Sequence, residues 1–316
     1  MAYVNIVKGA SGAGKSTLLD VLAQRKTTGT ISGQILYNYS PALTSSAYVM
    51  QDNVHIASLT VKESLWYAAQ LRLPEQWSTV EKEERVQHIL QVLGLTAVAN
   101  TIVGNEYKRG ISGGQAKRLS IGVEIINLPD LMFLDEPTTG LDSTISLEVM
   151  AAVRNLANQN RTVICTIHSP SPPTFALFDS LLLLAKGRTI YFGPVDEAVP
   201  YFTQSPFEFH FKPNSNPADF VVAVAGSFLQ GKGDRHVSGD ELADYYSSSK
   251  GIENEQRIRE MSSLKMNGKE DVGVELERVR HHSCSTSIYH QIKTLTQRAV
   301  IKTLRDRRAT VVTFAR

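Results

Sequence analysis

The sequence has little cysteine, no long apolar run and no strong excess of charge of either sign. Cys165 and Cys284 are its two cysteines, too few for a disulfide framework and without the spacing of a Zn²⁺ site. This scarcity favours a reduced, cytosolic setting. No run approaches the roughly 20 apolar residues of a membrane-spanning helix, and the first residues lack the regions of a secretory signal. The sequence as given is therefore not expected to cross a bilayer.

The overall composition is that of an ordinary globular protein. The net charge is +2 and aromatic residues make up 8% of the chain, so neither feature argues for a nucleic-acid partner. Apolar residues make up 42% of the 316 residues. That share is sufficient to build the core of one large domain or of two ordinary ones.

A glycine-rich stretch, GASGAGKST at residues 9–17, lies between a short apolar run and a stretch of helical periodicity. It satisfies the pattern G-x-x-x-x-G-K-[ST] in the strand, loop and helix context that the pattern requires. In such a loop the backbone N–H groups and the helix dipole attract phosphate. We therefore predict a nucleotide site here, rather than a plain glycine turn. Its residues are Gly9, Ser11, Gly12, Gly14, Lys15, Ser16 and Thr17.

Two near-continuous apolar runs, LMFL before Asp135 and TVICTI before His168, end in polar residues. Such runs are typical of parallel strands buried on both faces, with functional groups at their C-terminal ends. Asp135 is placed to position Mg²⁺ for a phosphate-binding loop, and Glu136 to polarise a water for attack on a γ-phosphate. The alternative is a solvated strand end. A helix over about 143–158 and a hairpin around Lys186-Gly187 complete the predicted α/β pattern.

Further motifs accompany the loop and the carboxylates in a fixed order: YVMQD, ISGGQAKRLSIGVEI, TTGLDS and TIHS. Together they resemble the nucleotide-binding cassette of ABC transporters, with its Walker A, Q-loop, signature, Walker B, D-loop and H-loop. RGISGGQAKRLSIGVEI, DEPTTGLDS and NPADF are similar to the G subfamily, which includes pleiotropic drug resistance transporters. The similarity covers residues 4 to about 225. It implies a P-loop NTPase fold with a mainly parallel sheet and a helical signature subdomain.

The resemblance implies a role for several single residues. Gln51 would contact Mg²⁺ and sense the γ-phosphate, and His168 would contact the γ-phosphate beside Glu136. Without the motif order, a lone histidine or glutamine is ordinarily a surface or hydrogen-bonded group. The predicted metal residues are Ser16, Gln51 and Asp135. The remaining nucleotide-binding residues are Ser112, Gly113, Gly114 and Gln115 of the signature, which in this family serves the partner cassette's ATP, and Asp142 of the D-loop.

The function implied by the resemblance is ATP hydrolysis coupled to transmembrane export of lipids, sterols or hydrophobic drugs. ATP and Mg²⁺ are the expected cofactors. The expected partners are a second cassette, identical or different, and a transmembrane domain in the full-length protein, with no nucleic acid. The full-length protein would act at the cytoplasmic face of a membrane, and this chain alone would be cytosolic or peripheral. Two alternatives stay open: a nonenzymatic truncated remnant or interaction module, and a soluble ABC ATPase not involved in transport.

Three segments are expected along the chain. Residues 1–226 form the cassette, 227–287 a polar linker or peripheral helices, and 288–316 a basic amphipathic helix leading toward an absent membrane domain. In the last segment Ile288, Ile292 and Leu295 share one helical face with Ala299. Its basic residues are Lys293, Arg298, Lys302, Arg305, Arg307, Arg308 and Arg316. They fit an anionic membrane surface, and the alternative is a solvated basic tail.

The N-terminal edge departs from the family pattern. An ABC cassette has two strands before Walker A and an aromatic residue that stacks on adenine, whereas eight residues precede Gly9 here. Tyr3 lies in the strand that enters the loop and is badly placed to replace that aromatic. The first strands are therefore expected to be missing. The HHSC stretch at 281–284 lacks a second ligand pair, and no metal site is expected there.

Overall fold

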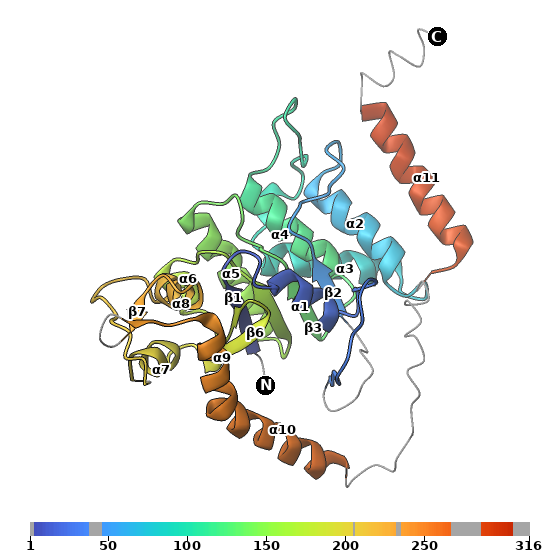
Figure 1. The fold of residues 1–316 in the computed structure, drawn as a ribbon. Coiled ribbons are helices and arrows are strands. Elements are labelled where there is room, and N and C mark those ends of the chain that lie inside the picture. The colour runs from blue at the N-terminus through green and yellow to red at the C-terminus, as the bar shows by residue number, and fades with distance from the viewer. Residues whose placement is uncertain (1–2, 38–45, 205, 232–234, 267–285, 306–316) are drawn as a thin grey trace. The chain divides into compact units, whose positions relative to one another are not determined.

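A computed structural model describes residues 3–37, 46–204, 206–231, 235–266 and 286–305, traced in Figure 1. The chain divides into two compact units. The first unit comprises residues 1–48 and 130–279, and the second comprises residues 49–129 and 280–316. The HHSC stretch and the basic residues beyond 305 lie outside the described residues.

A six-stranded sheet holds the first unit together, in the order β2-β3-β4-β1-β5-β6. The strands are β1 (Tyr3–Gly9), β2 (Ser46–Val49), β3 (Leu131–Leu134), β4 (Thr162–Thr166), β5 (Ser180–Ala185) and β6 (Arg188–Pro194). β1 pairs in parallel with β4 and with β5, and β3 pairs in parallel with β4. β5 and β6 form the expected antiparallel hairpin around Lys186-Gly187. The prediction of a mainly parallel α/β sheet is confirmed.

The central strands are buried because their side chains are apolar on both faces of the sheet. Met132, Phe133 and Leu134 of β3 are fully buried, as expected for a strand covered on both sides. The register sets Leu134 opposite Cys165 and Val7 opposite Thr166. The C-terminal ends of β1, β3 and β4 therefore lie at one edge of the sheet, where the loop after β1 also begins.

Helices of the first unit follow from local sequence signals. They are α1 (Lys15–Leu22), α5 (Ser143–Ala157), α6 (Pro172–Phe175), α7 (Ala198–Gln204), α8 (Pro217–Ala225), α9 (Gly239–Ser248) and α10 (Lys250–Met266). α5 begins after Asp142, whose side chain accepts a hydrogen bond from the backbone N–H of Ile145. Its apolar face buries Val149, Val153 and Leu156, in agreement with the helix predicted over 143–158.

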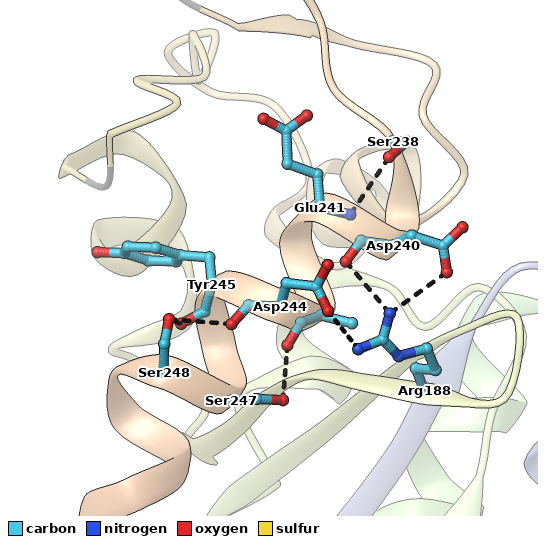
Figure 2. A network of polar contacts seen from close by, with 9 residues as sticks. Arg188, Ser238, Asp240, Glu241, Asp244, Tyr245, Ser247 and Ser248 are labelled. Carbon is cyan, nitrogen blue, oxygen red and sulfur yellow. Dashed lines mark hydrogen bonds and ion pairs between the residues drawn. The ribbon is translucent and has the colours of Figure 1, made fainter.

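The segment after residue 226 contributes to this unit. α9 packs against β6, and both Leu242 and Tyr246 of α9 are buried. Figure 2 shows Arg188 of β6 directed at Asp240 and Asp244 of α9. The range 227–287, expected to be a polar linker or peripheral helices, is thus helical over much of its described part. Its first helix is part of the packed unit.

The second unit is helical. Its elements are α2 (Val61–Arg72), α3 (Thr79–Val92), the 3₁₀ turn η1 (Thr96–Val98), α4 (Gly113–Glu124) and α11 (Ile288–Arg305). α2, α3 and α4 each begin with a capping box, in which a hydroxyl residue and a residue three positions later cap each other's backbone N–H. Gly122 allows close packing, because an added Cβ would lie 2.9 Å from a methyl group of Leu65.

α11 packs against α2 (Figure 1). The hydrogen bonds between the two helices join polar side chains, including His290 with Gln70 and Arg305 with Glu63. Arg305 makes a two-point ion pair with Glu63, at 2.6 and 2.8 Å, and Thr294 is the buried residue of the helix. The apolar residues expected to share one face are exposed, at 76% for Ile288 and 60% for Ile292. No helix in the described part of the chain combines the length and the apolarity that a membrane crossing demands.

Candidate functional site

The loop between β1 and α1 requires glycine for steric reasons. Gly9 has φ +152°, and a Cβ at this position would lie 2.4 Å from the carbonyl oxygen of Leu184 on β5. Gly14 caps the N-terminus of α1 with φ 94°, and its cap position carries no side-chain hydrogen bond. The N–H groups of the first helical turn are therefore left for a ligand, with the positive end of the helix dipole behind them. This is the geometry expected for phosphate binding.

Lys15 is held inside this loop. Its side chain is 8% exposed, and its ammonium group donates to the carbonyl oxygens of Gly9 and Ala10, both at 3.1 Å. The loop therefore curls around one positive charge. Because both acceptors are backbone carbonyls, the charge has no carboxylate partner among these contacts and is available to phosphate oxygens. Ser11, Gly12 and Thr17, also predicted, lie in the same loop and the first turn of α1.

Ser16 and Asp135 meet at the sheet edge. Asp135 directly follows β3, and its Oδ1 accepts a hydrogen bond from Ser16 Oγ at 3.1 Å. The same Oδ1 accepts from Thr166 Oγ1, at the end of β4, at 2.6 Å. A hydroxyl and a carboxylate are oxygen ligands of the kind that Mg²⁺ prefers, usually together with phosphate oxygens and waters. These two residues therefore fit the predicted magnesium site.

Glu136, the predicted water-orienting residue, has an unusual backbone conformation. Its φ of 44° lies in the left-handed region, which non-glycine residues adopt rarely and often at functional positions. Its backbone N–H donates to Thr166 Oγ1 at 2.9 Å. Its carboxylate accepts from Thr139 Oγ1 at 2.8 Å through Oε2. Both ends of the residue are thus fixed by threonine hydroxyls.

The D-loop and the H-loop line one pocket of about 280 Å³. The exposed ring of His168 lies there, with its Nδ1 3.1 Å from Ser169 Oγ. The carboxylate of Asp142 is engaged as the N-cap of α5. Asn216, from the NPADF stretch, reaches the same pocket and donates to the carbonyl oxygen of Pro170 at 2.9 Å. The structure therefore brings NPADF together with the H-loop.

The remaining predicted residues belong to the second unit. Ser112 and Gln115 form the capping box of α4, in which the Ser112 N–H donates to Gln115 Oε1 at 2.9 Å. Gly113 and Gly114 form the first turn of that helix. Gln51 is exposed, and its backbone carbonyl accepts from the buried Lys117 of α4 at 2.6 Å. The Q-loop backbone is therefore fastened to the helix that follows the signature.

Sequence reasoning missed three side chains of these sites: Thr139, Thr166 and Lys117. Thr139 and Thr166 lie within or beside recognised motifs, but nothing in their spacing indicates a hydrogen bond to Glu136 or Asp135. Such contacts depend on β3 and β4 being neighbours in the sheet. Lys117 follows the signature by two residues, and its burial has no sequence signal.

A glycine loop and a strand-end carboxylate that meet at one edge of a mainly parallel sheet define a P-loop nucleotide-binding protein. Residues 3–139 match the family model described as ABC transporter, and residues 168–311 match the model described as ABC-2 type transporter. The chain also resembles the crystal structure of the ADP conformation of an ATP-binding cassette of an ABC transporter. The TM-score is 0.52 and the identity 21%, over 65% of this chain and 85% of that one, which supports the cassette fold.

The named relatives of the chain show which subfamily it resembles. The chain is 47% identical over 225 residues to the broad substrate specificity ATP-binding cassette transporter ABCG2 of Rattus norvegicus, covering 70% of this chain and 34% of that protein. It is 37% identical over 327 residues to the same transporter of Bos taurus, covering 98% of this chain and 49% of that protein. The ABC transporter G family member 3 of Dictyostelium discoideum is 41% identical over 76% of this chain and 17% of its own length.

The chain belongs to the ABC transporter family, and within it to the G subfamily. The resemblance drawn from the motifs is confirmed. The chain spans between a third and a half of the length of the rat and bovine relatives.

Proposed function

We propose that this chain binds ATP with Mg²⁺, hydrolyses it together with a second cassette, and thereby drives export of hydrophobic compounds by an ABC transporter. One observation carries the proposal: Ser16, next to Lys15 in the loop after β1, donates a hydrogen bond to Asp135, which follows β3 and precedes Glu136. Phosphate-binding and water-orienting groups are thereby close enough to act on the same phosphoryl group.

The chain's own residues divide the chemistry. Lys15 and the N–H groups of α1 bind the phosphates and stabilise the charge that shifts to the leaving oxygen. Ser16 and Asp135 would hold Mg²⁺, which supplies further charge neutralisation when bound. Glu136 orients a water for in-line attack and accepts its proton. The exposed His168 ring is free to contact the γ-phosphate from the end of β4.

A second cassette is needed to complete the site. In the G subfamily the signature serves the ATP of the partner cassette, and here Ser112 to Gln115 form the N-terminus of the 12-residue helix α4. That N-terminus presents backbone N–H groups and a positive dipole suited to phosphate. ATP-dependent dimerisation distinguishes a second copy of this chain from a different cassette as the partner.

The membrane link is supported by the match of residues 168–311 to an ABC-2 type transporter model and by α11. This helix leaves Ile288, Ile292 and Leu295 exposed. Lys293 and Lys302 on the same helix are exposed too. An exposed apolar stripe accompanied by lysines fits the surface of an anionic membrane. The name of the rat and bovine relatives, broad substrate specificity transporter, favours cargo of several kinds. The resemblance to the G subfamily favours hydrophobic compounds among them.

The decisive experiment is ATP-dependent dimerisation of the Glu136→Gln variant, measured by light scattering with ATP and Mg²⁺. Loss of the water-orienting carboxylate should leave ATP bound and trap a closed dimer. Glu253→Gln is the matched control, since Glu253 is exposed and lies well beyond the last of the motifs, NPADF, in sequence. Because this control keeps Glu136, it should hydrolyse ATP as the unchanged chain does, and it should be monomeric once the ATP is hydrolysed.

Lys15→Ala supplies the opposite control. This variant should neither bind ATP nor dimerise, because the phosphate-binding charge is gone. If folded Glu136→Gln protein stays monomeric with ATP and the unchanged chain shows no hydrolysis, the chain acts as a nonenzymatic interaction module. If Glu136→Gln dimerises only when a different G-subfamily cassette is added, the working unit is a heterodimer.

A further inference from the structure

We propose that Thr166 is a positioning residue of the ATPase site, whose hydroxyl sets the orientation of both Asp135 and Glu136. The proposal rests on the ATP hydrolysis proposed above. Thr166 is the last residue of β4 and is fully buried. It is the first residue of the TIHS motif, two residues before His168, and the motif resemblance assigned it no role.

The geometry gives this hydroxyl two contacts with distinct directions. Thr166 Oγ1 lies 2.6 Å from Asp135 Oδ1 and 2.9 Å from the backbone nitrogen of Glu136. A carboxylate accepts only, so the hydroxyl proton goes to Asp135. A lone pair of the same oxygen then accepts from the Glu136 N–H. One hydroxyl thus links Asp135 and Glu136, donating a hydrogen bond to the first and accepting one from the second.

The contact to Glu136 acts on a strained backbone. A left-handed conformation is unfavourable for a non-glycine residue and persists only where neighbouring groups hold it. Glu136 has φ 44°, and its backbone N–H donates a hydrogen bond to Thr166 Oγ1. Thr139 fixes the other end of the residue by donating to its carboxylate at 2.8 Å. Removing the Thr166 hydroxyl would leave the Thr139 hydrogen bond to the Glu136 carboxylate in place and would release the Glu136 backbone N–H.

The contact to Asp135 acts on the metal site. Asp135 Oδ1 also accepts from Ser16 Oγ, at 3.1 Å. The short bond from Thr166 anchors this oxygen to β4, so that the carboxylate keeps one orientation toward Ser16. Outer partners of this kind typically change metal affinity or activity by roughly 10- to 100-fold when they are lost.

The test compares Thr166→Val, which keeps the shape and loses the hydroxyl, with Thr166→Ser, which keeps the hydroxyl. Three quantities are measured: kcat for ATP, the Mg²⁺ concentration for half-maximal activity, and the affinity for a fluorescent ATP analogue in EDTA. We expect Thr166→Val to lose roughly 10- to 100-fold in kcat and to need more Mg²⁺. Its affinity in EDTA should stay within about twofold, because the loop that binds the phosphates is untouched. Thr166→Ser should remain close to the unchanged chain.

Several outcomes would overturn the proposal. These are an unaltered kcat and Mg²⁺ requirement in Thr166→Val, an equal loss in Thr166→Ser, or a loss of affinity in EDTA as large as the loss of kcat. If Thr166→Val does not fold, Thr166→Ala and Thr166→Ser give the same comparison, since they differ by the hydroxyl alone. If the unchanged chain binds the analogue without hydrolysing ATP, the proposed function fails. The role of Thr166 is then tested by the gain in affinity for the ATP analogue when Mg²⁺ is added. This gain should be lost in Thr166→Val and kept in Thr166→Ser.

Discussion

Ser16 Oγ lies 3.1 Å from Asp135 Oδ1, although the two residues are 119 positions apart in the sequence. The contact joins the first turn of α1 to the residue that follows β3. It predicts that Ser16→Ala loses roughly 10- to 100-fold in affinity for an ATP analogue when Mg²⁺ is present. The affinity in EDTA should be retained, because Lys15 and the α1 N–H groups remain. Fluorescence titration with and without EDTA checks this, and an equal loss in both conditions would contradict it.

Lys117 predicts a stability effect in the second unit. Its ammonium group is buried and donates to the carbonyl oxygens of Gln51 at 2.6 Å and Met50 at 3.3 Å. Lys117→Met keeps the bulk of the side chain and removes these charged hydrogen bonds, so we expect a loss of about 1–3 kcal/mol in unfolding free energy. Urea denaturation measures it. Lys302→Met, at an exposed lysine of α11, is the control and should change little; equal stabilities for the two variants would contradict the prediction.

Local signals in the sequence were sufficient for much of the fold. Capping boxes at Thr60, Ser78 and Ser112 mark the starts of three helices, and apolar runs mark β3 and β4. The glycine pattern fixed the loop around Lys15 because its steric demands are local. These features depend on residues within a few positions of one another, which is the range over which sequence patterns are informative.

Contacts between segments that are distant in the chain could not be predicted from the sequence. Thr166 reaches Asp135 because β3 and β4 are neighbours, a fact of sheet order. Leu242 and Tyr246 are two apolar residues four positions apart in a polar stretch, which makes too narrow a stripe to predict packing on β6. In α11 the periodicity picks out Ile288, Ile292 and Leu295, but the helix packs on α2 through polar side chains. Ion pairing between Arg305 and Glu63 has no periodic signature.

Where α9 packs on β6, we expect the buried apolar contacts to contribute more to stability than the ion pairs at the surface. Leu242 is 2% exposed, so Leu242→Ala should cost about 2–5 kcal/mol of unfolding free energy. Arg188 and its partners Asp240 and Asp244 lie at the surface (Figure 2), where ion pairs are screened by water and salt. Arg188→Met should therefore lower the melting temperature far less than Leu242→Ala. Thermal unfolding of both variants tests this, and a larger drop for Arg188→Met would contradict it.

Lys8 of β1 predicts a pH-dependent gain in stability. Its side chain is fully buried, and its Nζ has no hydrogen-bond partner in the part of the chain that the structure describes. The ring of Phe175 lies 5.8 Å away. Burial lowers the pKa of Lys8 to about 8, against a raising effect of Asp219 and a further lowering by Lys15. Between that pH and the ordinary lysine pKa of 10.5, the unfolded chain binds more protons than the folded one, so stability rises with pH.

Replacing this lysine removes the cost of burying a charge. Lys8→Met should raise the unfolding free energy at pH 7 by an amount on the order of 2–3 kcal/mol. The gain should shrink as the pH rises through 8 toward 10.5, because the wild-type amine becomes neutral in the folded state and then in the unfolded one. Urea denaturation at pH 7 and pH 10 measures this, with Lys212→Met as an exposed control. If the gain in unfolding free energy were equal at both pH values, it would come from packing and not from the charge. If Lys8→Met lost unfolding free energy at pH 7, the ammonium group would stabilise the folded chain.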